Sequence, residues 1–386
     1  MFAPPTLPIP NVCGGAIQTL STYILNENER SDADFEFLVI STANEEAEKA
    51  AAKYKNSRFL FYKEKISTTI YVQFWRVLRK LFPDLVYVHQ GMFYQFAKEI
   101  HKFAPDCILL EGNYNQIKHA NKFGYPVIYH LHTDLINKET PHLNRIIAGH
   151  PQFWVISEFL KKRVEEVGIK NVRIYKNCID TDAFLSNNKR NVREELGIAE
   201  TEKVLLYCGR VVPIKGIMEL MKAFHYANIP NMTLLIVGGS NFADSKLSKY
   251  VSDLQDYAIQ NKIKVVFTGY VKSSELPAYY HVSDFFAYPS ICNEAAGMGI
   301  IEATCCGLSV ITTNMGGIPE YIDKERTILV DYDDNFIENL TKAIRLQYSN
   351  QKYEKIETTK ETPYVKSYGL DVYYKEFSKL LKGVVR

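Results

Sequence analysis

The sequence of 386 residues lacks the features that mark several classes of protein. Its formal net charge is only +2, whereas dedicated nucleic-acid-binding proteins show a basic patch or a strongly basic domain. No apolar run approaches the ~20 residues that span a bilayer, and the first ten residues hold no basic segment followed by an apolar core. These absences argue against a nucleic-acid partner, a transmembrane helix and a secretory leader.

Paired cysteines are also missing. The cysteines number seven, an odd count, and no two of them form a C-x-x-C pair. This pattern disfavours both a disulfide framework and a zinc site built from paired thiolates. Repeats of fixed period and low-complexity tracts are absent as well. We therefore expect a folded protein of the reducing cytoplasm.

What the sequence does contain is short apolar runs that alternate with helix-like stretches. Runs of this kind are typical of strands buried on both faces of a parallel, doubly wound α/β sheet. In the first half the runs are FEFLVI, DLVYVH, CILLEG, PVIYHLH, FWVIS and VRIYKN. In the second half they are KVLLYCG, TLLIVGG, KVVFTGY, FFAYPS, LSVITTN and TILVDY. Helices are expected at AIQTLSTYILNE, SEFLKKRVEEVG, 216–227, 246–260, 274–282 and 298–306.

The length fits two such domains. The polar, Asn-rich stretch 181–197 leads into a fresh predicted helix, and 350–366 is again polar. We predict a first domain over residues 1–185, a second over 186–365, and a C-terminal helix within 366–386 that packs back on the first domain.

Two cations follow the run KVLLYCG, in the stretch CGRVVPIKG. Arg210 and Lys215 stand between that predicted strand and the next predicted helix. Loops that follow the strands are where open α/β sheets bind their ligands, so the two charges are placed to neutralise a diphosphate. The alternative is that both are solvated loop residues, as basic side chains mostly are.

The stretch NEAAGMGIIE, residues 293–302, places two acids around a glycine turn at a predicted helix start. A helix N-terminus carries unpaired N–H groups that suit an anion. Glu302, about one turn inside, has two oxygens for neighbouring ribose hydroxyls, and Glu294 would face the far end of the same ligand. A sugar nucleotide has both features. Taken alone, Glu302 also fits an acid that only complements the helix dipole.

The first half holds less specific candidates. Gly14 and Gly15 precede the first predicted helix, where a backbone without side chains can approach a phosphate or a substrate. His132 ends the predicted strand PVIYHLH and can bond a hydroxyl. Glycines before a helix and a lone histidine at a strand end are also common structural features, so both interpretations stay open.

Three further stretches match patterns of ligand binding. Asp32-Ala33-Asp34 and Asp180-Thr181-Asp182 have the D-x-D spacing of metal-dependent sugar transferases. Neither lies at the carboxyl end of a predicted strand, where metal ligands would converge, so we discount both. Residues 71–82, YVQFWRVLRKLF, form either a basic amphipathic helix for an anionic membrane surface or an ordinary packed helix.

Taken together, these motifs resemble the retaining glycosyltransferases of family 4, whose GT-B fold has two Rossmann-like domains that face each other across a cleft. EAAGMGIIEATCCG, residues 294–307, is similar to that family's E-x-x-G-x-x-x-x-E-A-x-x-x-G stretch, position for position. YCGRVVPIKG, SEFLKKRVEEVGI and NCIDTDAF are also similar to family motifs. Asn177-Cys178 departs from the usual Asn-Gly, and the first strand is very short.

The resemblance implies roles in binding the donor. Arg210 and Lys215 would bind the diphosphate, Glu302 the ribose, and the backbone around Val271 the base. Backbone amides at the helix start would contact the transferred sugar and the phosphate. These amides belong to Gly297, Met298 and Gly299.

The resemblance also implies roles at the reacting centre. Glu294 would hold sugar hydroxyls near the reacting carbon, and His132 would contact the sugar from the first domain. Gly14 and Gly15 would border the acceptor, and Gly15 also the donor phosphates. The side chains assigned to catalysis are Glu294, His132, Arg210 and Lys215.

The sequence therefore predicts a metal-independent, retaining glycosyltransferase of the hexosyl- or N-acetylhexosaminyltransferase class. Its donor would be a nucleotide diphosphate sugar, UDP-sugar first. Its acceptor would be a glycan, by family habit a lipid-linked saccharide in surface polysaccharide or glycoconjugate synthesis at the inner face of the cytoplasmic membrane. No cofactor is expected, since the two cations would replace a metal ion at the diphosphate. The alternatives are a non-catalytic GT-B subunit of another transferase and a GT-B nucleotide-sugar epimerase.

Overall fold

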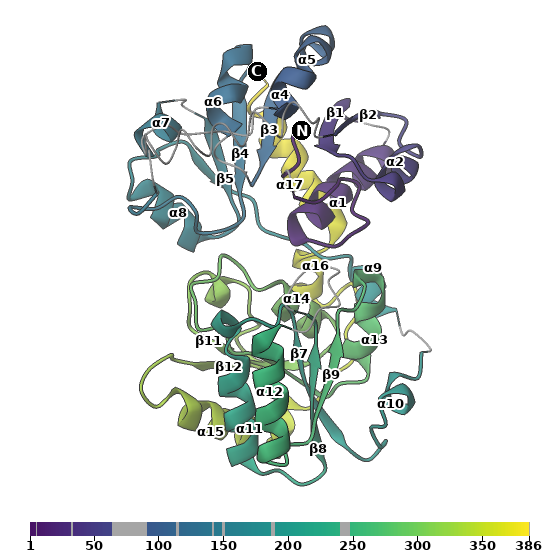
Figure 1. The fold of residues 1–386 in the computed structure, drawn as a ribbon, viewed down its shortest axis with the longest axis vertical. Coiled ribbons are helices and arrows are strands. Elements are labelled where there is room, and N and C mark those ends of the chain that lie inside the picture. Colours follow the sequence, from purple (N-terminus) through teal and green to yellow (C-terminus); the bar gives the residue numbers. More distant parts are fainter. Residues whose placement is uncertain are drawn as a thin grey trace. The chain divides into compact units, whose positions relative to one another are not determined.

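The fold is described from a computed structural model (Figure 1). It covers residues 1–4, 6–31, 34–63, 91–112, 116–140, 143–148, 151–186, 190–239 and 248–385. Contacts divide the chain into two compact units, unit 1 with Met1–Lys176 and Tyr374–Arg386, and unit 2 with Asn177–Tyr373. Asn177 already bonds within unit 2, because its N–H donates to the Tyr321 hydroxyl at 3.3 Å.

Unit 1 is built on parallel strands in two sheets. The strands are β1 (Phe37–Thr42) and β2 (Ser57–Tyr62) in one sheet, and β3 (Ile108–Glu111), β4 (Val127–Leu131), β5 (Gln152–Val155) and β6 (Val172–Ile174), in that order, in the other. Phe2 forms one parallel bridge to Ile40 of β1 and another to Leu110 of β3. The two sheets are therefore joined through the first residues of the chain.

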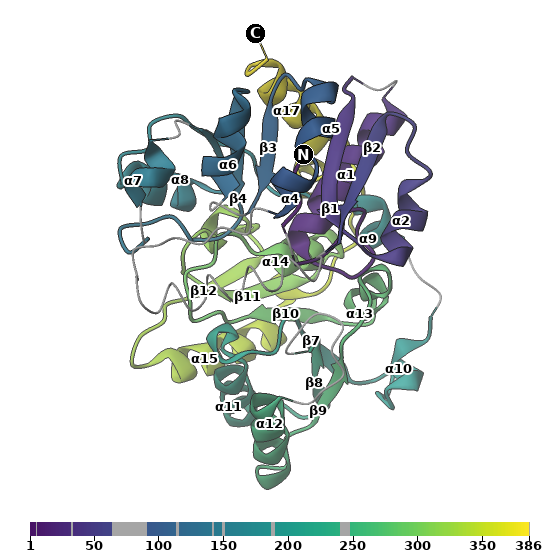
Figure 2. The ribbon, with the colours of Figure 1, turned by 45° about the horizontal axis from the view of Figure 1, so that its top comes forward.

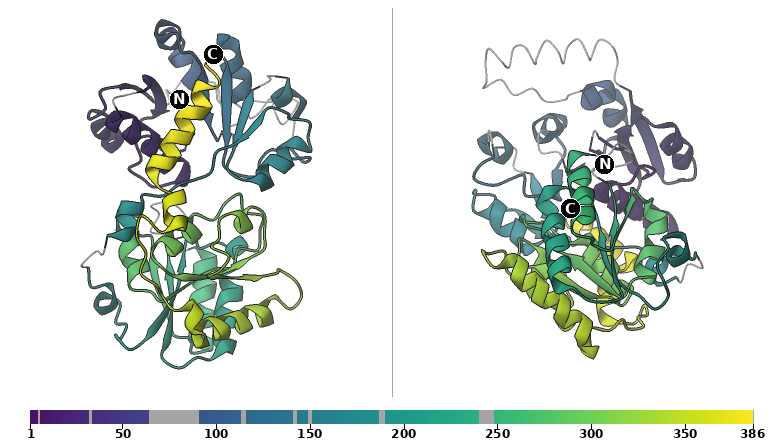
Figure 3. Two further views of the ribbon diagram at one scale, coloured as in Figure 1. Left: turned by 180° about the vertical axis from the view of Figure 1, so that it is seen from behind. Right: turned by 60° about the horizontal axis from the view of Figure 1, so that its bottom comes forward.

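Helices surround these sheets. They are α1 (Ala16–Arg30), α2 (Glu45–Ala51), α4 (Gly91–Gln95), α5 (Ala97–Phe103), α6 (Ile117–Ala120), η2 (Asn121–Phe123), α7 (Leu143–Ile147) and α8 (Glu158–Glu165). Helix α17 (Leu370–Lys382) starts in unit 2 and continues into unit 1, where it runs along the sheets (Figure 3, left). Its Phe377 is fully buried against the rings of Phe35, Trp154 and Tyr175.

Unit 2 holds one six-stranded parallel sheet in the order β12-β11-β10-β7-β8-β9 (Figure 2). Its strands are β7 (Lys203–Cys208), β8 (Met232–Val237), β9 (Val265–Gly269), β10 (Phe285–Tyr288), β11 (Ser309–Thr313) and β12 (Thr327–Val330). Strands β7, β8 and β9 follow one another toward one edge of the sheet, and β10, β11 and β12 follow one another toward the opposite edge. The point at which the topology reverses therefore lies between β7 and β10.

Helices cover both faces of this sheet. They are α9 (Thr181–Leu185), α10 (Val192–Glu195), η3 (Pro213–Lys215), α11 (Ile217–Ala227), α12 (Lys249–Gln260), η4 (Ser273–Glu275), α13 (Leu276–His281), α14 (Met298–Cys305), η5 (Ile318–Glu320), α15 (Phe336–Ser349), η6 (Gln351–Tyr353) and α16 (Pro363–Ser367). One layer pairs α11 with α15, and the other groups α14 with α9, α13 and α16. Strands β8, β10 and β11 are buried along their whole length between these layers.

The prediction of parallel, doubly wound α/β sheets is confirmed. Each apolar run of the second half forms one of the strands β7 to β12, and the predicted helices 216–227, 246–260, 274–282 and 298–306 correspond to α11, α12, α13 with η4, and α14. The run DLVYVH and the stretch 71–82 lie outside the described residues. Within the described residues, no helix combines the length and the apolar character needed to cross a membrane.

The second D-x-D pair has structural partners. Asp180 is the N-cap of α9, and its side chain accepts a hydrogen bond from the Ala183 N–H at 3.1 Å. Asp182 forms an exposed ion pair with Lys360. Of the first pair, only Asp34 is described, and its carboxylate lies 3.3 Å from the Ser378 hydroxyl. Helix capping explains the pattern at Asp180 without a metal ion.

Candidate functional site

The predicted donor residues of unit 2 follow the two strands at which its topology reverses. Arg210 and Lys215 come after β7, and Glu294 comes after β10. These strands are adjacent and parallel, with Phe285 paired to Leu205. Ligands of open α/β sheets bind outside the carboxyl ends of the strands at such a point. Figure 2 shows β7, β10 and α14 together at this edge.

Lys215 and Glu294 form an ion pair there. Their side chains are only 9% and 14% exposed. The ammonium of Lys215 also donates to the Tyr288 hydroxyl at 3.1 Å and lies 5.4 Å from the centroid of that ring. Glu294 accepts a further hydrogen bond from the Ser290 hydroxyl at 2.7 Å. The pair is thus a largely desolvated cation and anion, each held by neutral hydrogen-bonding groups.

The turn that carries the lysine requires a glycine. Helix η3 ends at Gly216, whose φ is +69°, and a Cβ on this residue would lie 2.0 Å from the carbonyl oxygen of Pro289. The Ile291 N–H donates to the Ile214 carbonyl at 3.0 Å. The loop after β7 therefore packs directly on the loop after β10, and this contact fixes the cation relative to the acid.

Helix α14 begins beside this pair. Its N-cap is Gly297, which has no side chain to bond the first amides, so those of Met298 and Gly299 have no side-chain cap. A Cβ on Gly299 would lie 3.1 Å from the Phe286 ring and 3.3 Å from the Cys208 carbonyl. The start of the helix thus packs closely against the ends of β10 and β7, with its partial positive charge at the same edge.

Glu302 lies one turn further along α14. Its Oε2 accepts a hydrogen bond from the Tyr280 hydroxyl at 2.6 Å. Burial raises the pKa of Glu302 above its ordinary value, and the hydrogen bond from Tyr280 opposes this shift. One carboxylate oxygen is thus held by a hydrogen bond from the protein.

Arg210 and Val271 lie at two other points of the same sheet edge, after β7 and β9. Arg210 is exposed, and its carbonyl accepts a hydrogen bond from the buried Tyr207 hydroxyl at 2.8 Å. Val271 is half-buried and stands two residues after β9, which is separated from β7 by β8. Because β7 and β9 are parallel strands of one sheet, Arg210 and Val271 lie at the same edge of the sheet as Lys215.

Two of the predicted residues of unit 1, Gly14 and Gly15, directly precede α1. Gly15 is the N-cap of α1 with φ +99°, and a Cβ there would lie 2.4 Å from Gln18 Oε1 and 2.9 Å from Leu7 Cδ1. The Gly14 N–H donates to Asn11 Oδ1 at 2.8 Å. The positive φ of Gly15 therefore opposes a side chain there, and a Cβ would also displace the ends of the Gln18 and Leu7 side chains.

His132 directly follows β4 and belongs to a buried triad. Its Nε2 lies 2.9 Å from Oε2 of Glu111, and Nδ1 of His130 lies 3.1 Å from the same oxygen. Glu111 of β3 and His130 of β4 are direct partners in the strand register. All three side chains are at most 5% exposed.

The contacts within the triad shift the pKa values of Glu111 and His132. Burial alone would raise the pKa of Glu111, but the charge of His130 and the hydrogen bonds from both histidines outweigh it and lower the value to about 2. Burial first, and then the charge of His130, lower the pKa of His132 to about 4. At neutral pH His132 is therefore an uncharged imidazole that donates from Nε2 to Glu111, which leaves Nδ1 as its acceptor.

Within the described part of the chain, this triad is also the group of side chains that could hold a metal ion. One donor atom from each of Glu111, His130 and His132 lies within 4.8 Å of the others. The Glu111 oxygen nearest to the histidines already accepts a hydrogen bond from each of them. Hydrogen bonding therefore accounts for the arrangement of that oxygen without an ion.

Sequence reasoning missed the partners of these residues. Tyr288 and Ser290 stand in the last half of the run FFAYPS, six and four residues before Glu294, and this closeness in sequence was the available signal. Tyr280 lies in a helix and Glu111 lies within the run CILLEG, and neither local sequence marks a contact. Both contacts depend on which strands and helices become neighbours.

The chain is similar to known glycosyltransferases. Residues 188–361, within unit 2, match the family described as Glycosyl transferases group 1. The chain is 30% identical over 213 residues to the lipopolysaccharide 1,2-N-acetylglucosaminetransferase of Salmonella typhimurium, with 54% of each chain covered. It is 24% identical to the spore coat protein SA of Bacillus subtilis, over 86% of this chain and 85% of that one. The chain spans 54% and 59% of the first curated relatives that it matches.

Solved structures share the fold. A glycosyltransferase from Rickettsia africae has a TM-score of 0.78 at 16% identity and covers 100% of this chain and 98% of its own. HepE from Anabaena, solved in complex with UDP and glucose, has a TM-score of 0.72 at 18% identity, with 99% and 98% covered. These likenesses show the GT-B fold of two Rossmann-like domains. Together with the family match they support a glycosyltransferase of the GT-B type.

Proposed function

We propose that the chain is a retaining, metal-independent glycosyltransferase of family 4 that moves a sugar from a nucleotide diphosphate to a glycan acceptor. The observation that carries the proposal is the buried Lys215–Glu294 pair beside the start of α14. A departing diphosphate needs fixed positive charge, which Lys215, Arg210 and the helix amides supply. The carboxylates of Glu294 and Glu302 accept hydrogen bonds from sugar and ribose hydroxyls.

His132 is proposed to contact the transferred sugar from unit 1. As a neutral imidazole held by Glu111, it presents Nδ1 as a hydrogen-bond acceptor for a sugar hydroxyl. Gly14 and Gly15 border the acceptor, where a backbone without side chains permits close approach. Met298 and its neighbours in the first turn of α14 contribute amides to the donor phosphate, and the backbone at Val271 binds the base.

A UDP-sugar is the proposed donor, of the hexosyl or N-acetylhexosaminyl class. HepE, which shares the fold, is described in complexes with UDP and with UDP-glucose. The name of the Salmonella relative supports a glycan acceptor of surface polysaccharide type. We propose a lipid-linked saccharide, used at the inner face of the cytoplasmic membrane.

The proposal is tested by transfer from labelled UDP-sugars to an acceptor. We expect Lys215→Ala to reduce turnover at least ~100-fold, the loss typical when one stabilising group is removed from a developing negative charge. Lys249→Ala is the matched control, because this lysine is exposed on α12 of the same unit. Turnover of the Lys215 variant within a few fold of the control would rule out the proposed site.

Product analysis in the same assay separates the alternatives. Net retention of the anomeric configuration supports the proposed mechanism. Conversion of the donor sugar without an acceptor points to an epimerase, and binding of UDP without turnover of any donor points to a non-catalytic subunit. Full activity in EDTA, with no transition metal in the purified protein, supports metal independence and leaves the Glu111 triad as a hydrogen-bonded group.

A further inference from the structure

Four side-chain groups contact one oxygen of Glu294. Its Oε1 accepts a hydrogen bond from the Lys215 ammonium and another from the Ser290 hydroxyl, the latter at 2.7 Å. The Tyr288 hydroxyl lies 3.4 Å and the Cys292 thiol 3.8 Å from the same oxygen. A carboxylate oxygen has about two lone-pair sites, so Lys215 and Ser290 fill Oε1. Bonding of a sugar hydroxyl by Glu294 would therefore use its other oxygen, Oε2.

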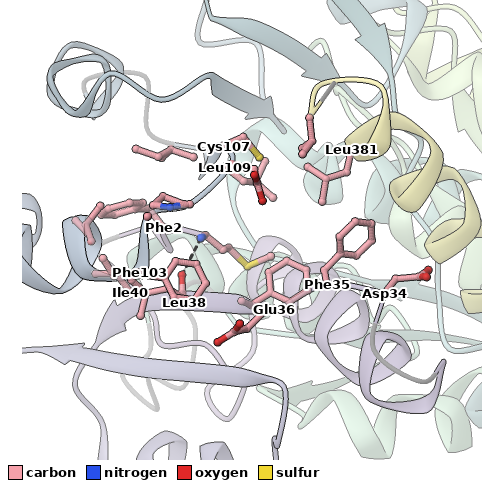
Figure 4. A pocket seen from close by; sticks show the side chains of 18 of the residues that line it. Phe2, Asp34, Phe35, Glu36, Leu38, Ile40, Phe103, Cys107, Leu109 and Leu381 are labelled. Carbon is pink, nitrogen blue, oxygen red and sulfur yellow. Dashed lines mark hydrogen bonds between the residues drawn. The ribbon is translucent and has the colours of Figure 1, made fainter.

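A cavity of about 320 Å³ in unit 1 is built differently. Side chains of β1, β3, α5 and α17 line it (Figure 4). The carboxylates of Asp34 and Glu36 point in different directions there, and Asp34 pairs with Lys382 at 3.4 Å. Ligand sites combine an apolar lining with polar groups that converge on one point. Polar groups that converge in this way are thus a feature of the donor site in unit 2.

The backbone of Ser290 is held in place at the end of the sheet. Ser290 is only 1% exposed, and its carbonyl accepts a hydrogen bond at 2.6 Å from the hydroxyl of Thr313, the last residue of β11. The neighbouring Pro289 carbonyl lies where a Cβ of Gly216 would be, so it packs closely on the loop after β7. The position of the Ser290 hydroxyl is thus set by contacts that do not involve Lys215.

The two hydroxyls beside Glu294 have different partners. The Tyr288 hydroxyl accepts from Lys215 at 3.1 Å and lies 3.4 Å from Glu294, so it contacts both members of the ion pair. The Ser290 hydroxyl has one proton and two acceptors within reach, Glu294 Oε1 at 2.7 Å and the Ile214 carbonyl at 3.3 Å. A hydrogen bond to a charged group is shorter and roughly twice as strong as a neutral one. Glu294 is therefore the preferred acceptor of the Ser290 proton.

The difference between these donors matters when a diphosphate binds. In the proposed function the diphosphate attracts the Lys215 ammonium, and the bond from that ammonium to Glu294 weakens. The bond from Ser290 is independent of the lysine, because Thr313 and the packed backbone hold the serine. The serine would then be the main group that keeps the carboxylate of Glu294 in its orientation.

On the basis of the function proposed above, we propose that Ser290 is a positioning residue of the donor site. Its hydroxyl holds Oε1 of Glu294 after Lys215 has turned to the diphosphate, so that Oε2 accepts from a hydroxyl of the transferred sugar. Ser290 itself contacts neither the nucleotide nor the sugar. Its loss should therefore reduce the affinity that the sugar adds, and leave the affinity for UDP unchanged.

The experiment measures the affinity that a sugar adds to the nucleotide. Titration calorimetry of the full chain gives Kd values for UDP, UDP-glucose and UDP-N-acetylglucosamine. The Kd of UDP divided by that of the tighter UDP-sugar is the sugar increment. Ser290→Ala removes the hydroxyl, and Ser290→Thr keeps one. The Tm of each variant shows whether it is folded.

Ser283→Ala is the matched control. Ser283 is 2% exposed just before β10, at the end of the strand opposite to Ser290, and its hydroxyl donates to the Tyr279 carbonyl at 2.7 Å. The control thus removes a buried serine hydroxyl that bonds the backbone. It should change neither the Kd of UDP nor the sugar increment.

We expect Ser290→Ala to lower the sugar increment at least ~5-fold with less than ~2-fold change in the Kd of UDP, since a hydrogen bond to a charged group is lost. Ser290→Thr should recover most of the increment. In a Glu294→Ala background, Ser290→Ala should change the increment less than ~2-fold, because the partner of the hydroxyl is already gone.

An unchanged sugar increment in Ser290→Ala would overturn the proposal, as would a further loss of the same size in the Glu294→Ala background. A parallel loss of UDP affinity would assign the hydroxyl to the Ile214 carbonyl and the lysine loop instead. Equal Kd values of the parent chain for UDP and both UDP-sugars would show that Oε2 holds no sugar hydroxyl, which also overturns the proposal. Failure of the parent chain to bind any of the three would contradict the proposed function itself, and this failure is read without the variants.

Discussion

At the scale of single residues, the surroundings of Glu302 oppose the charged form of its carboxyl group. Its folded pKa is raised above the unfolded value by burial. A raised pKa contributes stability below the unfolded pKa, and this contribution is lost as pH rises through the folded pKa. The shift in the pKa of Glu302 therefore lowers the stability of the fold at neutral pH. A residue that lowers stability in this way is expected to be kept for another reason, such as ligand binding.

We predict that Glu302→Gln keeps or raises Tm at pH 7 and weakens UDP binding at least ~10-fold, since the amide has one acceptor oxygen, which Tyr280 occupies, and an NH2 donor in place of the other. Thermal unfolding and titration calorimetry with UDP measure the two effects. Glu325→Gln is the control, because this acid is exposed in the same unit. A fall in Tm of several degrees at pH 7, with UDP binding retained, would assign Glu302 to structure alone.

Gly216 offers a second test at this scale. Its φ of +69° and the 2.0 Å approach of a Cβ to the Pro289 carbonyl both oppose a side chain. Gly197 has a φ of +66° with nothing within 4 Å of its Cβ position. We predict that Gly197→Ala costs about 1–2 kcal/mol, the strain of a left-handed residue, and that Gly216→Ala costs clearly more.

Urea unfolding of the two alanine variants gives both free energies. The larger loss at Gly216 should come with reduced turnover, because this turn positions Lys215. Equal losses in the two variants would show that the loops after β7 and β10 separate easily, contrary to their packing.

The sequence predicted the candidate site residues more readily than the side chains that they contact. NEAAGMG and CGRVVPIKG both fall directly after apolar runs, so their place at a sheet edge follows from the pattern. That Lys215 meets Glu294 across 79 positions depends on β7 lying beside β10. Strand order is set by long-range packing, which local periodicity does not encode.

At the scale of elements, continuous apolar runs predicted the strands well because most strands here are buried on both faces. Strand β2 was not predicted, because it is not buried on both faces. It lies at the end of its two-stranded sheet, and its Arg58 is exposed, so SRFLFY does not read as a fully buried run. The pairing of β3 with β4, which brings Glu111 next to the histidines, could not be predicted from the local sequence either.

That pairing predicts a dependence of unit 1 on pH. The folded pKa of His132, about 4, lies below its ordinary value of 6.5, so the unfolded chain binds more protons between these values. Stability therefore falls as pH drops from 6.5 to 4, by about 3 kcal/mol at most from this group. Glu111, lowered to about 2 from 4.5, continues the loss at lower pH.

Urea unfolding between pH 7 and pH 4, followed by tryptophan fluorescence, measures this loss. His132→Gln keeps an N–H donor for Glu111 but takes up no proton, so its stability should change less over this range than that of the parent chain. A parallel pH dependence in both proteins would mean that other groups control the titration.

At the scale of the whole molecule, the chain forms two units, and α17 carries the chain from unit 2 back into unit 1. Phe377 of this helix is fully buried among aromatic rings of unit 1. We predict that Phe377→Ala costs about 3–5 kcal/mol. The tryptophan-detected transition of unit 1 should move to lower temperature, while UDP should still stabilise unit 2.

Differential scanning calorimetry with and without UDP separates the two transitions. Val372→Ala, on the same helix but 38% exposed, is the control and should change neither of them. Loss of the UDP-dependent shift in the Phe377 variant would show that the units do not unfold separately. The sequence indicated two α/β domains from repeated patterns, but the position at which one core ends follows only from contacts such as those of Phe377.

The Lys215–Glu294 pair gives the lysine an internal counter-ion. In the proposed function, a diphosphate that binds Lys215 would have to compete with Glu294, so donor binding would be an exchange of one anion for another. The displaced carboxylate is then free to accept from the sugar at the moment the sugar arrives. We therefore expect Glu294→Gln to bind UDP more tightly than the parent chain while it transfers sugar more slowly, a divergence that calorimetry and the transfer assay would reveal together.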